Sequence, residues 1–153
     1  MRNKRKLMID QLDKKIKPFL EAKMVLVPEN GWIRTIRTTL NMTMAQLGIK
    51  LGITRQGVKN IEDSEARGSI TINTLKEVAA AMEMKLVYAL VPKDGSIDEL
   101  IQKKAEELAR RIVLRTNQNM KLEDQGIGDQ KLRETIEDLT DEIKRDVRRS
   151  LWD

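Results

Sequence analysis

The sequence predicts a mainly α-helical protein, and three observations carry this prediction. Apolar residues recur every three or four positions along most of the 153-residue chain, which is the period of a helix with one buried face. Threonine or serine precedes several of these segments and can cap the start of a helix. Hydrophobic residues at 40% and charged residues at 35% are typical of a folded rather than a disordered chain.

The composition also excludes several classes of function. The chain contains no cysteine and no histidine, so it has no disulfide, no thiolate metal site and no histidine general base. Acidic residues within 137–142 have basic neighbours at helical spacing, which favours surface ion pairs over a divalent-metal site. We therefore expect no enzyme activity, no cofactor and no bound metal. No apolar stretch suits a signal peptide or a membrane span, so we expect a cytoplasmic protein with no membrane partner.

The net charge of +5 is distributed unevenly. Residues 1–23 hold eight basic and three acidic side chains, whereas residues 94–153 hold 12 basic and 15 acidic ones. A basic front half suggests a surface that binds a polyanion, although two solvated helix faces would give the same asymmetry. The alternatives for the basic start are an arm along DNA and a frayed end. Its cations are Arg2, Lys4, Arg5 and Lys6.

The first helices can be placed from their caps and breakers. One helix is expected over residues 4–17, with Met8 and Ile16 among its apolar positions, and Pro18 should end it because proline lacks an N–H group. Four short helices should follow, over residues 32–40, 43–51, 54–62 and 71–82. The buried side of the first of these four should be formed by Trp32, Ile33, Ile36 and Leu40.

An apolar run from Leu86 to Val91 breaks the helical period, and it is predicted to be the one β-strand of the chain. A single strand leaves its backbone groups unpaired, and the sequence offers no second strand of similar quality. We expect it to pair with the same strand of a second copy and form a homodimer, with a buried apolar linker as the alternative. The dimer-strand residues would be Leu86, Val87, Tyr88, Ala89, Leu90 and Val91.

The rear of the chain predicts two more helices. Ser96 should cap a long helix, and the polar residues 116–130 should form the loop after it. An apolar stripe from Leu132 to Leu151 predicts the last helix. Three regions are then expected: a basic N-terminal helix or arm at 1–27, a helical domain at 28–84, and a strand with helices for dimer or partner contacts at 85–153.

The segment from Thr43 to Ile61 carries the strongest functional motif. Two short helices that cross at a steep angle need a small residue where they approach, at Gly48, and a positive φ in the turn, at Gly52. An unrelated helical hairpin would need neither glycine. We therefore predict a helix-turn-helix within a core of five helices. Its shared apolar core should include Leu47, Leu51, Ile53, Val58 and Ile61.

The second helix of this motif would enter the DNA major groove with its first residues foremost. Arginine can donate two hydrogen bonds to guanine, and glutamine or asparagine can pair with adenine. Phe19, Trp32 and Tyr88 lie in apolar patterns, so no exposed aromatic platform for single strands is expected and duplex DNA is favoured. The expected base-reading residues are Arg55, Gln56, Lys59 and Asn60. The expected phosphate contacts are Thr54, Arg34, Arg37, Lys50 and Arg67, with an ordinary solvated charge as the alternative for the four cations.

Six blocks of the sequence carry a family resemblance: Gly31–Arg34, Leu40–Thr43, Glu65–Thr71, Leu86–Pro92, Met120–Gln125 and Leu151–Asp153. Over about residues 33–84 the chain resembles bacterial and phage regulators of the XRE or Cro helix-turn-helix type. Over most of its length it resembles the family named mobile mystery protein A. The resemblance implies a repressor-type core and a regulator encoded beside a Fic-domain protein.

Such a regulator would act as the antitoxin of a toxin–antitoxin pair. It would bind a palindromic operator of its own operon as a homodimer and would neutralise its Fic-domain partner. Two features depart from the pattern: Met44 stands where such repressors often carry glutamine, and the Ser/Thr-x-x-x-Glu-Gly/Asn pattern of Fic inhibitors is missing. Control of the partner would then work by contact or occlusion.

The alternative function is an interaction module that neutralises a partner without reading DNA. The stripe at 132–151 could pack against that partner, with Trp152 as an anchor, because tryptophan is favoured at binding hot spots. The same stripe could instead complete the protein's own core.

Overall fold

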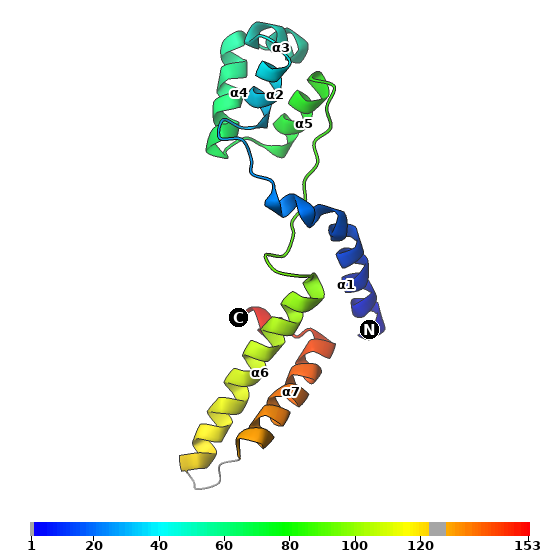
Figure 1. The fold of residues 1–153 in the computed structure, drawn as a ribbon, viewed down its shortest axis with the longest axis vertical. Helices are drawn as coiled ribbons and strands as arrows, with labels where there is room; N and C mark the ends of the chain where they lie inside the picture. Colours follow the sequence, from blue (N-terminus) through cyan, green and yellow to red (C-terminus); the bar gives the residue numbers. More distant parts are fainter. Residues whose placement is uncertain (1, 123–127) are drawn as a thin grey trace. The chain divides into compact units, whose positions relative to one another are not determined.

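The computed structural model describes residues 2–122 and 128–153. Within those residues it contains seven α-helices, three short 3-10 helices and no β-strand, so the prediction of a mainly helical fold is confirmed (Figure 1). The chain forms two compact units, one made of Glu21–Ala89 and the other of Met1–Leu20 together with Leu90–Asp153. This division differs from the predicted boundaries after residues 27 and 84, because the N-terminal helix packs with the C-terminal helices.

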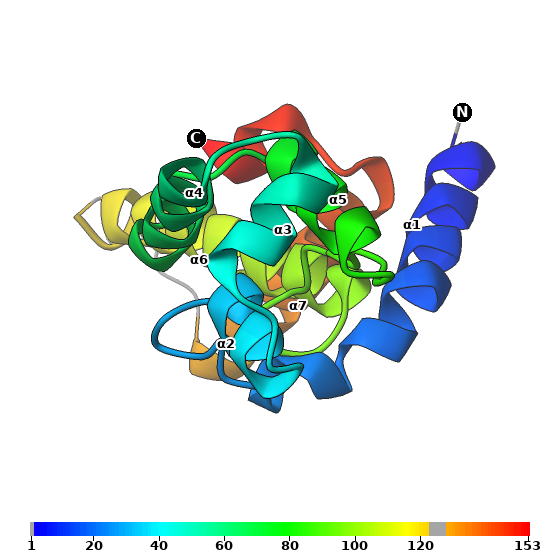
Figure 2. The same ribbon diagram turned by 90° about the horizontal axis from the view of Figure 1, so that it is seen from above.

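The Glu21–Ala89 unit contains four α-helices around one apolar core rather than the predicted five, because α1 belongs to the other unit. They are α2 (Trp32–Thr39), α3 (Met44–Leu51), α4 (Arg55–Arg67) and α5 (Ile72–Ala81), preceded by the 3-10 helix η2 (Glu21–Met24). α3 contacts both α4 and α5 and lies between them when seen from above (Figure 2). The buried core residues are Ile33, Leu47, Val58, Val78 and Met82.

Three helices of this unit begin at threonine caps, as the sequence predicts. Thr43 Oγ1 accepts a hydrogen bond from Gln46 N at 3.1 Å, and Gln46 Oε1 accepts one from Thr43 N at 2.8 Å, which makes a reciprocal capping box. Thr54 Oγ1 accepts from Gly57 N at 3.0 Å, and Thr71 caps α5 in the same way. The predicted starts of α3, α4 and α5 are therefore confirmed.

Three residues predicted to be buried in this unit are exposed instead. The exposed fractions are 44% for Trp32, 51% for Leu40 and 39% for Ile53. α2 has only eight residues and buries the line formed by Ile33 and Arg37, so Trp32 and Leu40 at its two ends fall outside that line. Ile53 lies in the turn after α3 and contacts the next helix, as described below.

The predicted strand is not formed in this single copy of the chain. Residues 84–91 follow α5 without regular secondary structure. Val87, Tyr88 and Leu90 are 63%, 62% and 92% exposed, so a buried linker is also wrong. Trp32 and Tyr88 are both exposed, so the expectation of no exposed aromatic side chain is wrong for these two residues. A lone strand would leave its N–H and C=O groups unpaired, which explains its absence from this segment. Pairing with a second copy stays a prediction.

The other unit is built from both ends of the chain. It contains α1 (Arg2–Ile16), α6 (Ile97–Leu122) and α7 (Asp129–Asp146), with the 3-10 helices η1 (Lys17–Phe19) and η3 (Arg149–Trp152). α6 and α7 pack side by side (Figure 1). Because α1 begins at Arg2, the basic start of the chain is helical rather than an extended arm. The buried core residues of the unit are Ile101, Ala105, Ala109, Ile143 and Leu151.

One carboxylate attaches α1 to the start of α6. Asp13 Oδ1 accepts from the backbone N of Ile97 at 2.7 Å, and Asp13 Oδ2 accepts from that of Asp98 at 3.2 Å. A negative charge is stabilising there, because the first N–H groups of a helix have no partner within it. Ser96 caps the same helix as predicted, since its Oγ accepts from Glu99 N at 3.1 Å.

The end of α6 differs from the prediction. The helix continues to Leu122 and α7 begins at Asp129, so the loop predicted at 116–130 is wrong over residues 116–122 and 129–130. Residues 123–127 lie outside the described part of the chain, and the block Met120–Gln125 extends into them.

The end of α7 also differs from the prediction. The helix stops at Asp146 rather than near Leu151, because Val147 adopts a left-handed φ of 43° and η3 then follows. The apolar stripe packs inside its own unit through Ile143 and Leu151, so it is not a free surface for a partner. Among the described residues, no helix combines the length and the apolar character needed to cross a lipid bilayer.

Candidate nucleic-acid interface

The turn between α3 and α4 depends on two glycines. Gly52 ends α3 with a φ of 67°, a left-handed conformation that residues with a Cβ rarely adopt. Ile53 N donates to Gly48 O at 2.9 Å, which folds the turn back onto α3. A Cβ at Gly48 would lie 2.7 Å from Ile53 O, so a larger residue would force the turn to shift. The small residue and the positive φ predicted at these positions are both required by this geometry.

α4 has one buried side and one exposed side. Val58 and Glu62, four residues apart, are only 1% and 3% exposed. Gln56, Lys59 and Asn60 are exposed on the rest of its circumference, as 3.6 residues per turn requires. Three of the four predicted base-reading residues therefore lie on one accessible surface.

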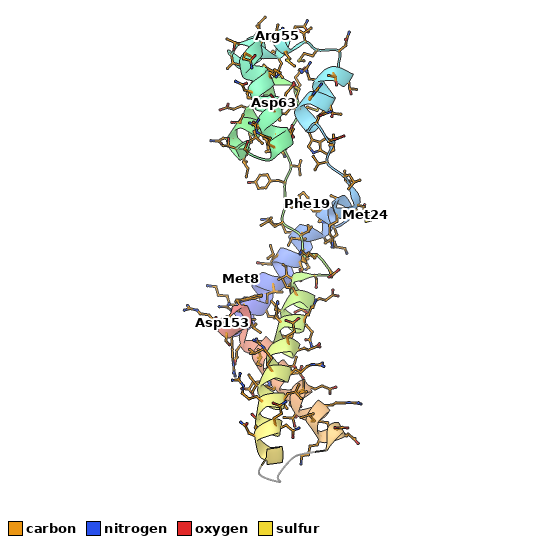
Figure 3. All side chains as sticks on the ribbon, turned by 90° about the vertical axis from the view of Figure 1, so that its left-hand side faces the viewer. Met8, Phe19, Met24, Arg55, Asp63 and Asp153 are labelled. Atoms are coloured by element: carbon orange, nitrogen blue, oxygen red, sulfur yellow. The ribbon has the colours of Figure 1, made fainter. Side chains whose placement is uncertain are left out.

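The fourth, Arg55, opens the first turn of α4, and Asp63 lies farther along the same helix (Figure 3). Arg55 is exposed. Lys59 Nζ lies 3.7 Å from Asp63 Oδ2, and the two side chains are 57% and 48% exposed. An ion pair so open to water contributes at most about 1 kcal/mol. The Lys59 ammonium can therefore leave Asp63 for a phosphate or a base.

Two amide side chains on this surface are already oriented by each other. Gln56 Nε2 donates to Asn60 Oδ1 at 3.1 Å. Gln56 Oε1 then remains as an acceptor and Asn60 Nδ2 as a donor. Adenine presents the complementary pair in the major groove, an N6 donor and an N7 acceptor.

Arg37 has a structural role, so its predicted contact with phosphate is wrong. The residue is 6% exposed. Its Nε donates to Glu62 Oε1, its Nη2 donates to Glu62 Oε2 at 3.2 Å, and its Nη1 donates to Met42 O at 2.9 Å. Because Arg37 follows Ile33 by one helical turn, it lies on the buried line of α2 and joins that helix to α4.

The other predicted phosphate contacts are exposed but lie on different elements. Arg34 is on α2, Lys50 is in the last turn of α3 and Arg67 ends α4. Arg67 lies about 18 Å along the helix axis from Arg55, at 1.5 Å per residue, so these two cations do not form one cluster. Thr54 uses its oxygen as the cap of α4, and its O–H can still donate to a phosphate.

Two carboxylates that hold this unit together are not among the residues predicted from the sequence. Glu65 accepts from the backbone N of Trp32 at 2.9 Å and of Ile33 at 2.8 Å, so α4 caps the start of α2. Glu62 neutralises the buried Arg37. The sequence does contain an indication of their burial, because both glutamates lie at helical spacing from the core residue Val58.

The Glu21–Ala89 unit carries a small excess of positive charge. Residues 21–89 contain nine basic and seven acidic side chains. Glu62 and Glu65 serve the internal contacts described above together with Arg37, and Asp63 pairs with Lys59. Within the described residues, no group of three or more acidic side chains could hold a metal ion. The chain matches no protein-family model, no curated protein and no solved structure.

Proposed function

We propose that this protein binds duplex DNA in a sequence-specific manner and represses transcription, with α3 and α4 as a helix-turn-helix. The observation that carries the proposal is the exposed surface of α4, which is formed by Gln56, Lys59 and Asn60. The opposite side of the helix is buried through Val58 and Glu62. The major groove is about 12 Å wide and admits one α-helix.

Each side chain has a role that its chemistry supports. Arg55 would donate to guanine O6 and N7, and the Gln56–Asn60 pair would match adenine. Lys50 and Arg34 would contact phosphates and set the register of the protein on the duplex. The positive end of the α4 dipole at Thr54 would add attraction for the DNA backbone.

Selection of bound sequences from a random duplex pool, followed by titration of the selected duplex, tests the proposal. Arg55→Ala should weaken binding to that duplex by about 1–3 kcal/mol and relax the preference at one position. The matched control is Lys76→Ala, which removes an exposed cation from α5 and should leave the preference unchanged. Equal affinity of the wild-type protein for selected and random duplexes would refute the proposal.

A homodimer would read a palindromic operator, with half-sites about 34 Å apart. The dimer contact is proposed at Leu86–Val91, since Val87, Tyr88 and Leu90 expose apolar surface that a pairing strand would cover. Leu90→Lys should shift the protein toward monomer in sedimentation equilibrium and reduce the stoichiometry on DNA. Lys85→Ala, in the same segment but without loss of apolar surface, is the control.

The family resemblance extends the proposal to an antitoxin that binds a Fic-domain partner. The main alternative is that such binding is the whole function and DNA is not read. The stripe packs within its own unit, so a partner would have to bind another surface, and Trp152, which is 54% exposed, is available as an anchor. If the Fic-domain protein implied by the resemblance is the partner, Trp152→Ala should reduce co-purification with it, whereas Arg55→Ala should not.

A further inference from the structure

Ile53 exposes apolar surface at the start of α4. It precedes the cap Thr54, is 39% exposed and lies outside the buried core of its unit. A Cβ at Gly57 would lie 3.3 Å from Ile53 Cδ1 and 3.4 Å from Ile53 Cβ. The isoleucine side chain therefore lies against the first turn of α4, beside the residue that follows Gln56.

Gly57 explains how this position is possible. Glycine is among the least favourable residues inside a helix, so its presence in the first turn of α4 needs a reason. The atom nearest to an added Cβ is Ile53 Cδ1 at 3.3 Å, followed by Ile53 Cβ and Thr54 Oγ1, both at 3.4 Å. Gly57 thus leaves room for the Ile53 side chain against the first turn of α4, the turn that also carries Gln56.

The major groove offers one apolar group at the base edges, the C5-methyl group of thymine. We propose that Ile53 contacts the C5-methyl group of a thymine next to the base pair read by Gln56, and so adds to sequence preference. This inference rests on the proposed binding of α4 in the major groove. It assigns Ile53, which the sequence placed in the core, to specificity instead.

Deoxyuridine substitution tests the contact, because it removes only the methyl group. Each thymine of the selected duplex is replaced in turn, and binding of the full-length protein is measured by fluorescence anisotropy. Replacement of one thymine should weaken wild-type binding about fourfold, the value expected for one buried methyl group. Ile53→Ala should bind the thymine and deoxyuridine duplexes equally.

Ile49→Ala is the matched control. Ile49 is also an isoleucine, is 81% exposed and lies on α3, so its removal should leave the methyl effect unchanged. Thermal unfolding of both variants checks that they are folded. If Ile53→Ala is not folded, Ile53→Val removes less of the side chain and can be used instead.

The possible results separate the two proposals. A methyl effect in the wild type that disappears only in the Ile53 variants supports the contact. An effect that persists in those variants, or no effect at any thymine, overturns the contact while leaving DNA binding by α4 in place. Absence of sequence-specific binding by the wild type overturns both.

Discussion

Replacing Arg37 by methionine should destabilise the Glu21–Ala89 unit by about 3–5 kcal/mol, because it leaves a buried carboxylate without its partner. The side chains of Arg37 and Glu62 are 8% and 3% exposed, so water cannot substitute for the guanidinium. Met42 O would also lose its donor. The loss is a large part of the free energy of unfolding of a small domain.

Removing both charges should be much less harmful than removing one. The double variant Arg37→Met/Glu62→Leu replaces the pair with apolar side chains of similar size, and such replacements are often close to neutral. Arg37→Lys should be intermediate, because an ammonium cannot donate to both carboxylate oxygens and to Met42 O in the same geometry.

Urea unfolding followed by tryptophan fluorescence can measure these differences. In a Trp152→Phe background the remaining reporter is Trp32, which lies in the Glu21–Ala89 unit. A cost below about 1 kcal/mol for Arg37→Met, which is the range of a surface pair, would contradict this expectation. A double variant no more stable than Arg37→Met would contradict it as well, since the cost would then not come from an unpaired charge.

Three further predictions concern the turn and its surroundings. Gly48→Ala should lower the thermal midpoint, with a cost of about 1–3 kcal/mol, because its methyl group would press on the Ile53 carbonyl; an unchanged midpoint in circular dichroism would contradict this. Thr54→Ala should cost about 1 kcal/mol through loss of the α4 cap, whereas Thr54→Ser should retain most of it in the same melts. Lys50→Ala should reduce the salt dependence of DNA binding by about 0.9 in the log–log slope, the value for one phosphate, and Arg34→Ala should do the same if it too contacts phosphate.

Features set by neighbours in sequence were predictable. The caps at Thr43, Thr54 and Thr71 are predictable because each threonine directly precedes a segment with helical spacing of apolar residues. Each threonine side chain accepts from a backbone N–H three residues later. The left-handed turn at Gly52 follows from a similar local rule. Such features need no knowledge of what packs against the helix.

Features that depend on tertiary contacts could not be predicted from the sequence. An arginine on a short helix looks like a surface cation, and only the position of Glu62 on another helix makes Arg37 internal. The end of α6 was missed for a related reason. Asn117 is 5% exposed and continues the buried line of Ala109 and Val113, so a polar residue occupies a position where an apolar one is expected.

The candidate site lies between these two cases. The exposed surface of α4 follows from helical spacing, so Gln56, Lys59 and Asn60 could be placed from the sequence. The hydrogen bond between the two amides, by contrast, is a choice of rotamer that spacing alone does not determine. Exposure of Ile53 depends on a missing side chain at Gly57, which is visible only when the turn is built.

The Asp13 carboxylate has a consequence for the order in which the chain folds during synthesis. Glu21–Ala89 leaves the ribosome as one continuous stretch and can close its core while translation proceeds. α1 is synthesised before α2–α5, but it cannot form its contact with α6 at that stage. The hydrogen-bond partner of Asp13, the backbone N of Ile97, lies 84 residues later in the sequence. The nascent chain should therefore complete α2–α5 before α1 packs against α6.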